Sequence, residues 1–160
     1  MLHNIDALFD NKSKILILGS FPSEKSRRAG FFYAHPQNRF WPLLAKILNC
    51  PVPQDMAEKR AMCLDNHIAL WDVIASCEIT GSSDSSIKNV RPNDISRLLS
   101  GTEISHIFLN GQTAGRLYER YLAAQADRQH TVLPSTSPAN AAFDISRLFS
   151  SWKEIRQYLD

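Results

Sequence analysis

Residues 33–41 place several chemically active side chains in one short polar stretch, which reads YAHPQNRFW. Aromatic rings stack on nucleobases, amides exchange hydrogen bonds with a base or hold a water molecule, and guanidinium groups pair with phosphates. Pro36 removes one backbone N–H, so the stretch cannot serve as an interior strand. These residue types at this spacing predict a site for a base and its backbone.

A helix must begin close to Asn38. Apolar residues recur at helical spacing from Phe40 to Ile47, and Pro42 is tolerated only near the first turn of a helix. The start of a helix carries free N–H groups and the positive end of the helix dipole. Asn38 therefore lies where an anion or an ordered water is well held, and we assign Phe40 and Trp41 to the core.

Four short apolar runs predict the strands that position this site. None of them alternates between polar and apolar residues, which is typical of parallel strands covered on both faces. Helical patterns lie between them, and the strongest is an amphipathic stretch at 145–159, whereas 80–93 is expected as one long surface loop. The pattern predicts a single α/β domain over residues 1–160, a three-layer α/β/α fold with a central four-stranded parallel sheet. The expected strands are Ile15–Leu18, Ile68–Trp71, Ile107–Leu109 and Thr131–Leu133.

The carboxyl ends of these strands should meet at one edge of the sheet, where open α/β sheets bind ligands. Gly19 follows the first strand and allows close backbone approach, and Pro22 stiffens the turn. Asp72 follows the second strand at a position where it should be buried, which is costly for an unpaired carboxylate. It is therefore either a salt-bridge or helix-cap residue, or an acceptor for a ligand N–H at the floor of a pocket. The segments that follow the strands are 19–23, 71–73, 110–113 and 134–140.

Three further features each have two interpretations. The small hydroxyl residues of 135–140 either bring donors close to phosphates or form a capped loop that enters the last helix. Phe21 and Tyr33 are either stacking rings or core residues. The basic cluster of Lys25, Arg27 and Arg28 is either a solvated face or a phosphate contact, and its place between two candidate motifs favours the contact.

Composition limits the class of protein. The formal net charge of +2 permits nucleic-acid binding without requiring it. No apolar run approaches the roughly 18 residues of a membrane span, and the first ten residues lack a signal-peptide pattern, so we expect a cytoplasmic, intracellular protein. Cys50, Cys63 and Cys77 fit no zinc spacing and are too few for an all-cysteine iron–sulfur cluster. We therefore expect neither a metal nor another cofactor.

Taken together, the motifs resemble those of the uracil-DNA glycosylase superfamily. The turn at 19–23 is similar to its first motif, a Gly-x-x-Pro turn. The loop at 135–140 stands in the place of its second motif, which grips the flipped-out strand. The segment at 33–41 resembles the one that holds the stacking aromatic in the mismatch-specific uracil glycosylases.

Within this superfamily the pattern best resembles the hypoxanthine-DNA (deoxyinosine) glycosylase family, over nearly the whole chain. The matching runs are Gly-Ser-x-Pro from Gly19, His-Pro-x-Asn-x-Phe-Trp from His35, Leu-Trp-Asp-Val from Leu70 and Ser-Pro-Ala from Ser137. Ser20 stands where classical uracil glycosylases have Asp or Asn, and Ser135 stands near the place of their second-motif histidine. The resemblance implies that Asn38 supplies the catalytic amide instead.

The resemblance implies an enzyme that hydrolyses the N-glycosidic bond of a deaminated base in DNA, hypoxanthine first, after flipping the nucleotide out of the duplex. Asn38 would orient the attacking water. No lysine stands where it could form a Schiff base, so we expect a monofunctional enzyme. We also expect the protein to be a monomer. The implied base-binding residues are Gly19, Ser20, Phe21, Tyr33 and Asp72, and the implied DNA contacts are Ser23, Ser135, Ser137, Pro138, Ala139 and Asn140.

Other interpretations of the sequence stay open. Uracil and xanthine are alternative target bases, because uracil offers an N–H flanked by carbonyls much as hypoxanthine does. Since Ser20 and Ser135 replace familiar catalytic side chains, a damaged-DNA-binding module without catalysis is a second alternative. A hydrolase of free nucleosides or nucleotides is a third.

Overall fold

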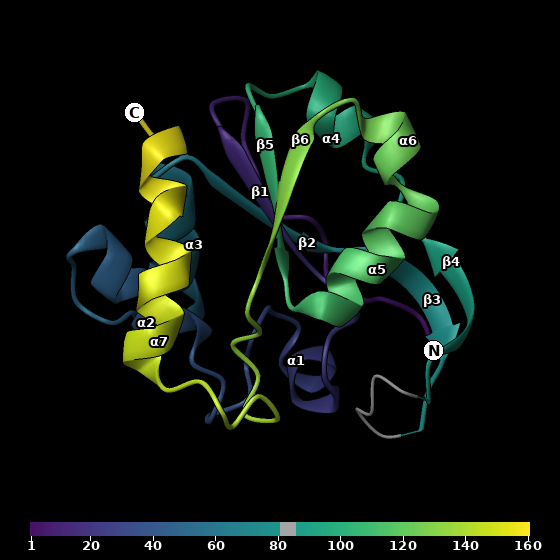
Figure 1. The fold of residues 1–160 in the computed structure, drawn as a ribbon, viewed down its shortest axis with the longest axis horizontal. Coiled ribbons are helices and arrows are strands. Elements are labelled where there is room, and N and C mark those ends of the chain that lie inside the picture. Colours follow the sequence, from purple (N-terminus) through teal and green to yellow (C-terminus); the bar gives the residue numbers. More distant parts are fainter. Residues whose placement is uncertain (81–85) are drawn as a thin grey trace.

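The computed structural model describes residues 1–80 and 86–160. It shows three layers, in which a parallel sheet lies between two layers of helices (Figure 1). The strand order in the central sheet is β2-β1-β5-β6, and every neighbouring pair is parallel. Each predicted strand lies within one of these elements, so the predicted fold class is confirmed. The strands are β1 (Ile15–Gly19), β2 (Ile68–Asp72), β5 (His106–Asn110) and β6 (Gln129–Leu133).

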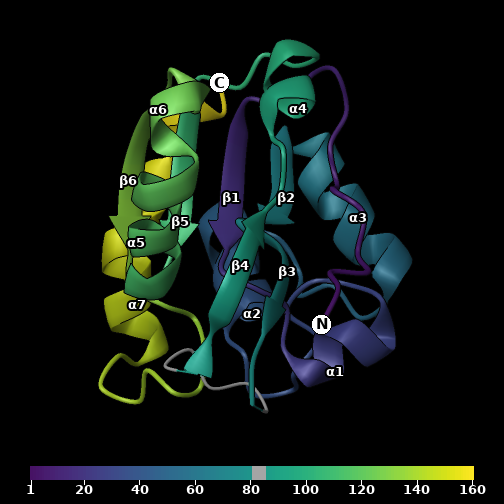
Figure 2. The ribbon, with the colours of Figure 1, turned by 90° about the vertical axis from the view of Figure 1, so that its right-hand side faces the viewer.

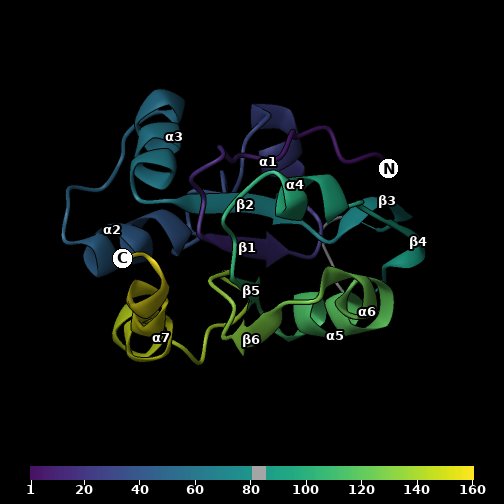
Figure 3. The same cartoon turned by 90° about the horizontal axis from the view of Figure 1, so that it is seen from above.

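Helices cover both faces of the sheet because the strand β1 at its centre is apolar on both faces. Residues 15–18 are all 0% exposed. Ile15 and Ile17 pack toward one set of helices, and Leu16 and Leu18 pack toward the other (Figures 1 and 3). The first set is α2 (Phe40–Leu48), α3 (Met56–Asp65) and α7 (Ile145–Trp152), and the second is α4 (Ser96–Ser100), α5 (Gln112–Tyr121) and α6 (Ala123–Ala126).

Two predicted elements differ from the structure. The predicted 80–93 loop is wrong for its last part, because β4 (Lys88–Pro92) pairs antiparallel with β3 (Ile74–Glu78) in a second, small sheet (Figure 2). The buried amide of Asn93 fixes this return of the chain by donating to the carbonyls of Asp72 and Ile74. Residues 81–85 of the predicted loop lie outside the described residues. The final helix was predicted to reach 159, but α7 ends at Trp152 and a 3-10 helix (Lys153–Tyr158) follows.

The first residues of the chain run beside β3. Leu2 forms an antiparallel bridge with Ser76, and the backbone N–H of His3 donates to the carbonyl of Ala75 at 2.7 Å. A short helix that was not predicted, α1 (Glu24–Ala29), follows the turn after β1 and is capped by Ser23. In the described residues, no helix is long and apolar enough to cross a membrane.

The strand order places a topological switch point between β1 and β5. From β1 the chain passes to β2 on one side of it and later to β5 on the other. Ligands bind open α/β sheets in the crevice beyond the carboxyl ends of the strands at such a point. Gly19 ends β1 and Asn110 ends β5, so the crevice lies between these two residues.

Candidate active site

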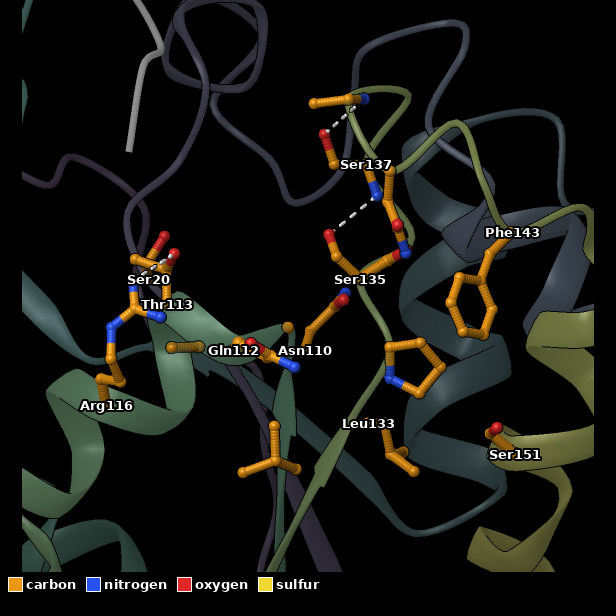
Figure 4. Close-up of a pocket in the computed structure, with 16 residues that line it drawn as sticks. Ser20, Asn110, Gln112, Thr113, Arg116, Leu133, Ser135, Ser137, Phe143 and Ser151 are labelled. Carbon is orange, nitrogen blue, oxygen red and sulfur yellow. Dashed lines mark hydrogen bonds between the residues drawn. The ribbon is translucent and has the colours of Figure 1, made fainter. Parts of the chain in front are cut away.

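Two neighbouring cavities open at the carboxyl edge of the sheet. The first has a volume of about 350 Å³ and is lined by residues that follow all four central strands, among them Gly19, Asp72, Asn110 and Ser135. This volume falls in the range of small-ligand sites. The second, of about 680 Å³, extends toward α5 and α7 (Figure 4). Both cavities are lined by Ser20, Asn110, Ser135, Ser137 and Ala139.

The structure brings almost all of the predicted site residues to these cavities. The exception is Pro138, which is exposed and lines neither cavity. The predicted residues that line the first cavity are Gly19, Ser20, Phe21, Ser23, Tyr33, Asn38, Asp72, Ser135, Ser137 and Ala139, and Asn140 lines the second.

Asp72 forms the floor of the first cavity. Its side chain is almost completely buried, and its Oδ2 lies 2.7 Å from Nε2 of His3. Its Oδ1 lies against Gly19 so closely that a methyl group at that glycine would come within 2.4 Å of it. One oxygen of this carboxylate is therefore paired, and the other lies at the glycine that lines the cavity. The role as acceptor for a ligand N–H stays a prediction.

The hydrogen bonds of His3 fix its tautomer. The backbone N–H of Ile5 can only donate, and it lies 3.2 Å from Nδ1 of His3, so Nδ1 is the acceptor. Nε2 then carries the ring proton and donates it to Asp72. His3 was not predicted as a site residue, because its partner is 69 positions away and no local pattern connects them.

Tyr33 lies in a conformation that tyrosine rarely adopts. Its φ is 52°, in the left-handed region, and its ring stacks on Phe40 with the centroids 4.1 Å apart. Its hydroxyl is buried without a hydrogen-bond partner among the described residues. Burial and then the negative charge of Asp72 raise the pKa of Tyr33, which the nearby Asn110 amide only partly opposes. The hydroxyl therefore stays protonated, as a neutral group above the cavity floor.

Asn38 stands at the start of α2, as predicted from the position of Pro42. Its Oδ1 accepts a hydrogen bond from the backbone N–H of Phe40 at 2.9 Å and a second from the hydroxyl of Thr136 at 2.8 Å. Both lone pairs of this oxygen are thus used. The NH2 group is the part of the amide left for a ligand, since the described residues offer it no partner.

Asn110 and Thr136 complete this network, and neither was predicted as a site residue. Oδ1 of Asn110 accepts from the backbone N–H of Thr136, and Nδ2 of Asn110 donates to the hydroxyl of Thr136, each at 3.0 Å. Thr136 itself is 0% exposed. The strand-end position of Asn110 was a usable signal, whereas nothing local distinguishes Thr136 from the serines beside it.

Arg39 connects the 33–41 segment to the loop at 134–143. Its guanidinium donates to the carbonyls of Thr136, Ser137, Asn140 and Phe143, and its backbone N–H donates to Thr136 as well. A guanidinium used in this way is not available to pair with phosphate. Arg39 therefore acts as a clamp that holds both segments of the site together.

We expect Arg39→Ala to destabilise the protein by about 2 kcal/mol, because hydrogen bonds from a charged donor would be lost from four carbonyls. The melting temperature should fall by about 4–8 °C in thermal unfolding followed by circular dichroism. Arg60→Ala is the matched control, since Arg60 is exposed on α3. Equal melting temperatures for the two variants would contradict the clamp.

The loop residues with predicted DNA contacts also hydrogen-bond within the loop. The hydroxyl of Ser135 accepts from the N–H of Ser137, and that of Ser137 accepts from the N–H of Ala139, each at 3.1 Å (Figure 4). Asn140 donates from Nδ2 to the carbonyl of Ser135. These bonds give the loop a defined shape beside the cavity mouth.

The basic cluster on α1 divides into separate roles. Arg27 donates to the carbonyl of Pro22 and lies over the ring of Phe21, so it supports the turn after β1. Arg28 pairs with Glu24 on the surface of α1. Arg27 therefore has a structural role that neither interpretation of the cluster anticipated, and Arg28 lies on a solvated face. The phosphate contact stays a prediction.

The part of the chain that the structure describes contains no cluster of side chains suited to bind a metal ion. No group of three or more His, Cys, Asp or Glu side chains is placed there to hold an ion. Cys50 is exposed, whereas Cys63 and Cys77 are buried, and burial raises the pKa of the Cys63 thiol. None of these cysteines lines either cavity.

Comparison with known proteins identifies the family. Residues 7–159 match the sequence model of the uracil DNA glycosylase superfamily. The chain belongs to this superfamily. The match covers almost the whole chain, including every segment that lines the two cavities.

Two proteins similar to this chain are named hypoxanthine DNA glycosylase. The one from Methanosarcina acetivorans is 39% identical over 152 residues, covering 93% of this chain and 94% of the relative. The one from Methanosarcina barkeri is 34% identical over 149 residues, or 92% of each chain. The solution structure of a putative uracil DNA glycosylase from M. acetivorans superposes with a TM-score of 0.81, at 35% identity over 99% of both chains.

Proposed function

We propose that this chain is a monofunctional DNA glycosylase that removes hypoxanthine from DNA. The arrangement that supports this function is a cavity with the carboxylate of Asp72 at its floor and the amide of Asn38 in its wall. The names of both relatives, which match more than nine-tenths of this chain, add support for hypoxanthine as the base.

The carboxylate of Asp72 suits a deaminated base. Hypoxanthine carries a hydrogen at N1, which a carboxylate oxygen accepts, whereas adenine has a lone pair at N1 that a carboxylate repels. Because His3 already donates to Oδ2, the oxygen beside Gly19 is the acceptor for the base. Uracil and xanthine offer similar N–H groups, so the preference for hypoxanthine rests on the relatives.

Catalysis begins when the damaged nucleotide leaves the duplex and enters the cavity. Cleavage of the N-glycosidic bond gives a sugar with oxocarbenium character, so the enzyme must place a water rather than generate a strong base. Asn38 holds this water, with Tyr33 or Phe21 stacked on the base and the 134–143 loop on the distorted backbone. Backbone N–H groups of the turn at 19–23 stabilise the negative charge that develops on the departing base.

The product is an intact strand with an abasic site. Strand cleavage would need an amine to form a Schiff base with the sugar, and no lysine is found among the described residues that line either cavity. Trapping of a covalent protein–DNA adduct with borohydride would contradict a monofunctional reaction.

The test uses duplex oligonucleotides that carry a single hypoxanthine, uracil or xanthine, incubated with the protein in EDTA and then cleaved with alkali at abasic sites. We expect cleavage of the hypoxanthine duplex, and DNA binding that weakens steeply with salt. Tight binding without release of any base would identify a damage-binding module instead. Equal hydrolysis of free deoxyinosine, without dependence on salt, would identify a nucleoside hydrolase.

A further inference from the structure

We propose that Thr136 is a positioning residue that locks the amide of Asn38, so that its NH2 group and not its carbonyl oxygen faces the flipped nucleotide. This role rests on the proposed glycosylase function for its kinetic consequence. The lock itself is a property of the partly buried hydrogen-bond network described above, in which Thr136 lies between Asn110 and Asn38.

The direction of every hydrogen bond in this network follows from two obligate donors. The backbone N–H of Thr136 can only donate, so it fixes Oδ1 of Asn110 as its acceptor and leaves Nδ2 to donate to the Thr136 hydroxyl. That hydroxyl then directs its own hydrogen to Oδ1 of Asn38. The N–H of Phe40 independently identifies the same atom of Asn38 as the oxygen.

Rotating the Asn38 amide by half a turn would be costly. The NH2 group would then face the N–H of Phe40, and the hydrogen of the Thr136 hydroxyl would lose its acceptor. A buried polar group without a partner costs about 1–3 kcal/mol, and Thr136 is completely buried. Phe40 alone would hold the oxygen at one point, whereas Thr136 adds a second point and fixes the plane of the amide.

The locked orientation determines what Asn38 does in the reaction. Since both lone pairs of its oxygen are used, Asn38 offers only donors to the cavity. It holds the attacking water by donating to the water oxygen, and it takes no proton from that water. A reaction with an oxocarbenium-like transition state gains from such placement, because a reacting atom misplaced by 1 Å costs about 10²-fold in rate.

The test compares Thr136→Val, which removes the hydroxyl at nearly constant volume, with Thr136→Ser, which keeps it. We expect Thr136→Val to lower the single-turnover rate of hypoxanthine release by about 10²-fold. Its affinity for a duplex with a tetrahydrofuran abasic analogue should stay close to wild type, and Thr136→Ser should restore most of the rate. Thr131→Val is the matched control, because Thr131 bonds His106 within the sheet and not in the site.

A second readout does not depend on activity. The side-chain NH2 resonances of Asn38, assigned by their loss in Asn38→Ala, should shift in Thr136→Val and stay in place in Thr136→Ser and Thr131→Val. If the wild type releases no base, the proposed function fails while the resonances still test the lock. A folded Thr136→Val protein with the wild-type rate, or with unshifted Asn38 resonances, would overturn the role of Thr136.

Asn38→Asp tests the donor directly. It keeps the shape and the oxygen that Phe40 and Thr136 bind, but it places a second oxygen where the wild type has NH2. We expect this variant to lose about as much rate as Asn38→Ala. A rate at or above the wild-type level would show that an acceptor serves there, and it would overturn the orientation proposed for Asn38.

Discussion

Asn38→Ala is expected to lower hypoxanthine release by about 10²–10³-fold, which is the cost of removing one placed donor from an active site. Binding of hypoxanthine-containing duplex should remain, because the carboxylate of Asp72 is unchanged and Arg39 still holds the 134–143 loop. Single-turnover assays with alkaline cleavage measure the rate, and fluorescence anisotropy with labelled duplex measures the affinity.

The matched control is Gln37→Ala, which removes an exposed amide one position earlier in the same segment. It should leave the rate unchanged. Comparable activity of Asn38→Ala and the wild type would refute Asn38 as the residue that holds the water. A parallel loss of rate and of affinity would show instead that the substitution disturbs the DNA-binding surface.

Asp72→Asn is expected to change the group at the cavity floor from a hydrogen-bond acceptor to a donor. Because Nε2 of His3 donates, the oxygen of the new amide would face His3 and its NH2 would face the cavity. An acceptor for N1–H of hypoxanthine would thus become a donor, and hypoxanthine release should fall by about 10- to 100-fold, the cost of an unmatched buried polar pair. The ratio of adenine to hypoxanthine release should rise, since N1 of adenine is an acceptor.

Asp65→Asn serves as the control, because it removes the same charge at an exposed position at the end of α3. Release rates from duplexes with hypoxanthine, uracil and adenine measure the selectivity of each variant. Uracil release should fall together with hypoxanthine release, because its N3–H needs the same acceptor. An unchanged ratio of adenine to hypoxanthine release in Asp72→Asn would remove Asp72 from base recognition.

The parts of the molecule that the sequence predicted are those with local signals. The four central strands are short apolar runs, and the start of α2 follows from Pro42. The strand β4 was missed because Lys88, Asn89 and Pro92 are residues typical of loops. Its pairing depends on β3, so the sequence of residues 88–92 by itself does not predict a strand.

The site shows the same division. Asn38 and Asp72 were predicted from their places beside a helix start and a strand end. The contacts of His3 with Asp72, of Arg39 with the 134–143 loop and of Thr136 with Asn38 join residues 69 to 104 positions apart, so no spacing rule connects them. Sequence patterns thus located two groups that line the cavity, while the side chains that orient those groups became visible only in three dimensions.

The span between Asn38 and Thr136 also has a consequence for the order in which the molecule forms. The N–H of Phe40 is two positions from Asn38, whereas the hydroxyl of Thr136 is 98 positions away. Contacts between distant segments close large loops and form late in folding. Until β6 has joined the sheet and the following loop has docked on Arg39, the amide is therefore held only by the N–H of Phe40. We expect a refolding chain to complete its core before it becomes competent for chemistry.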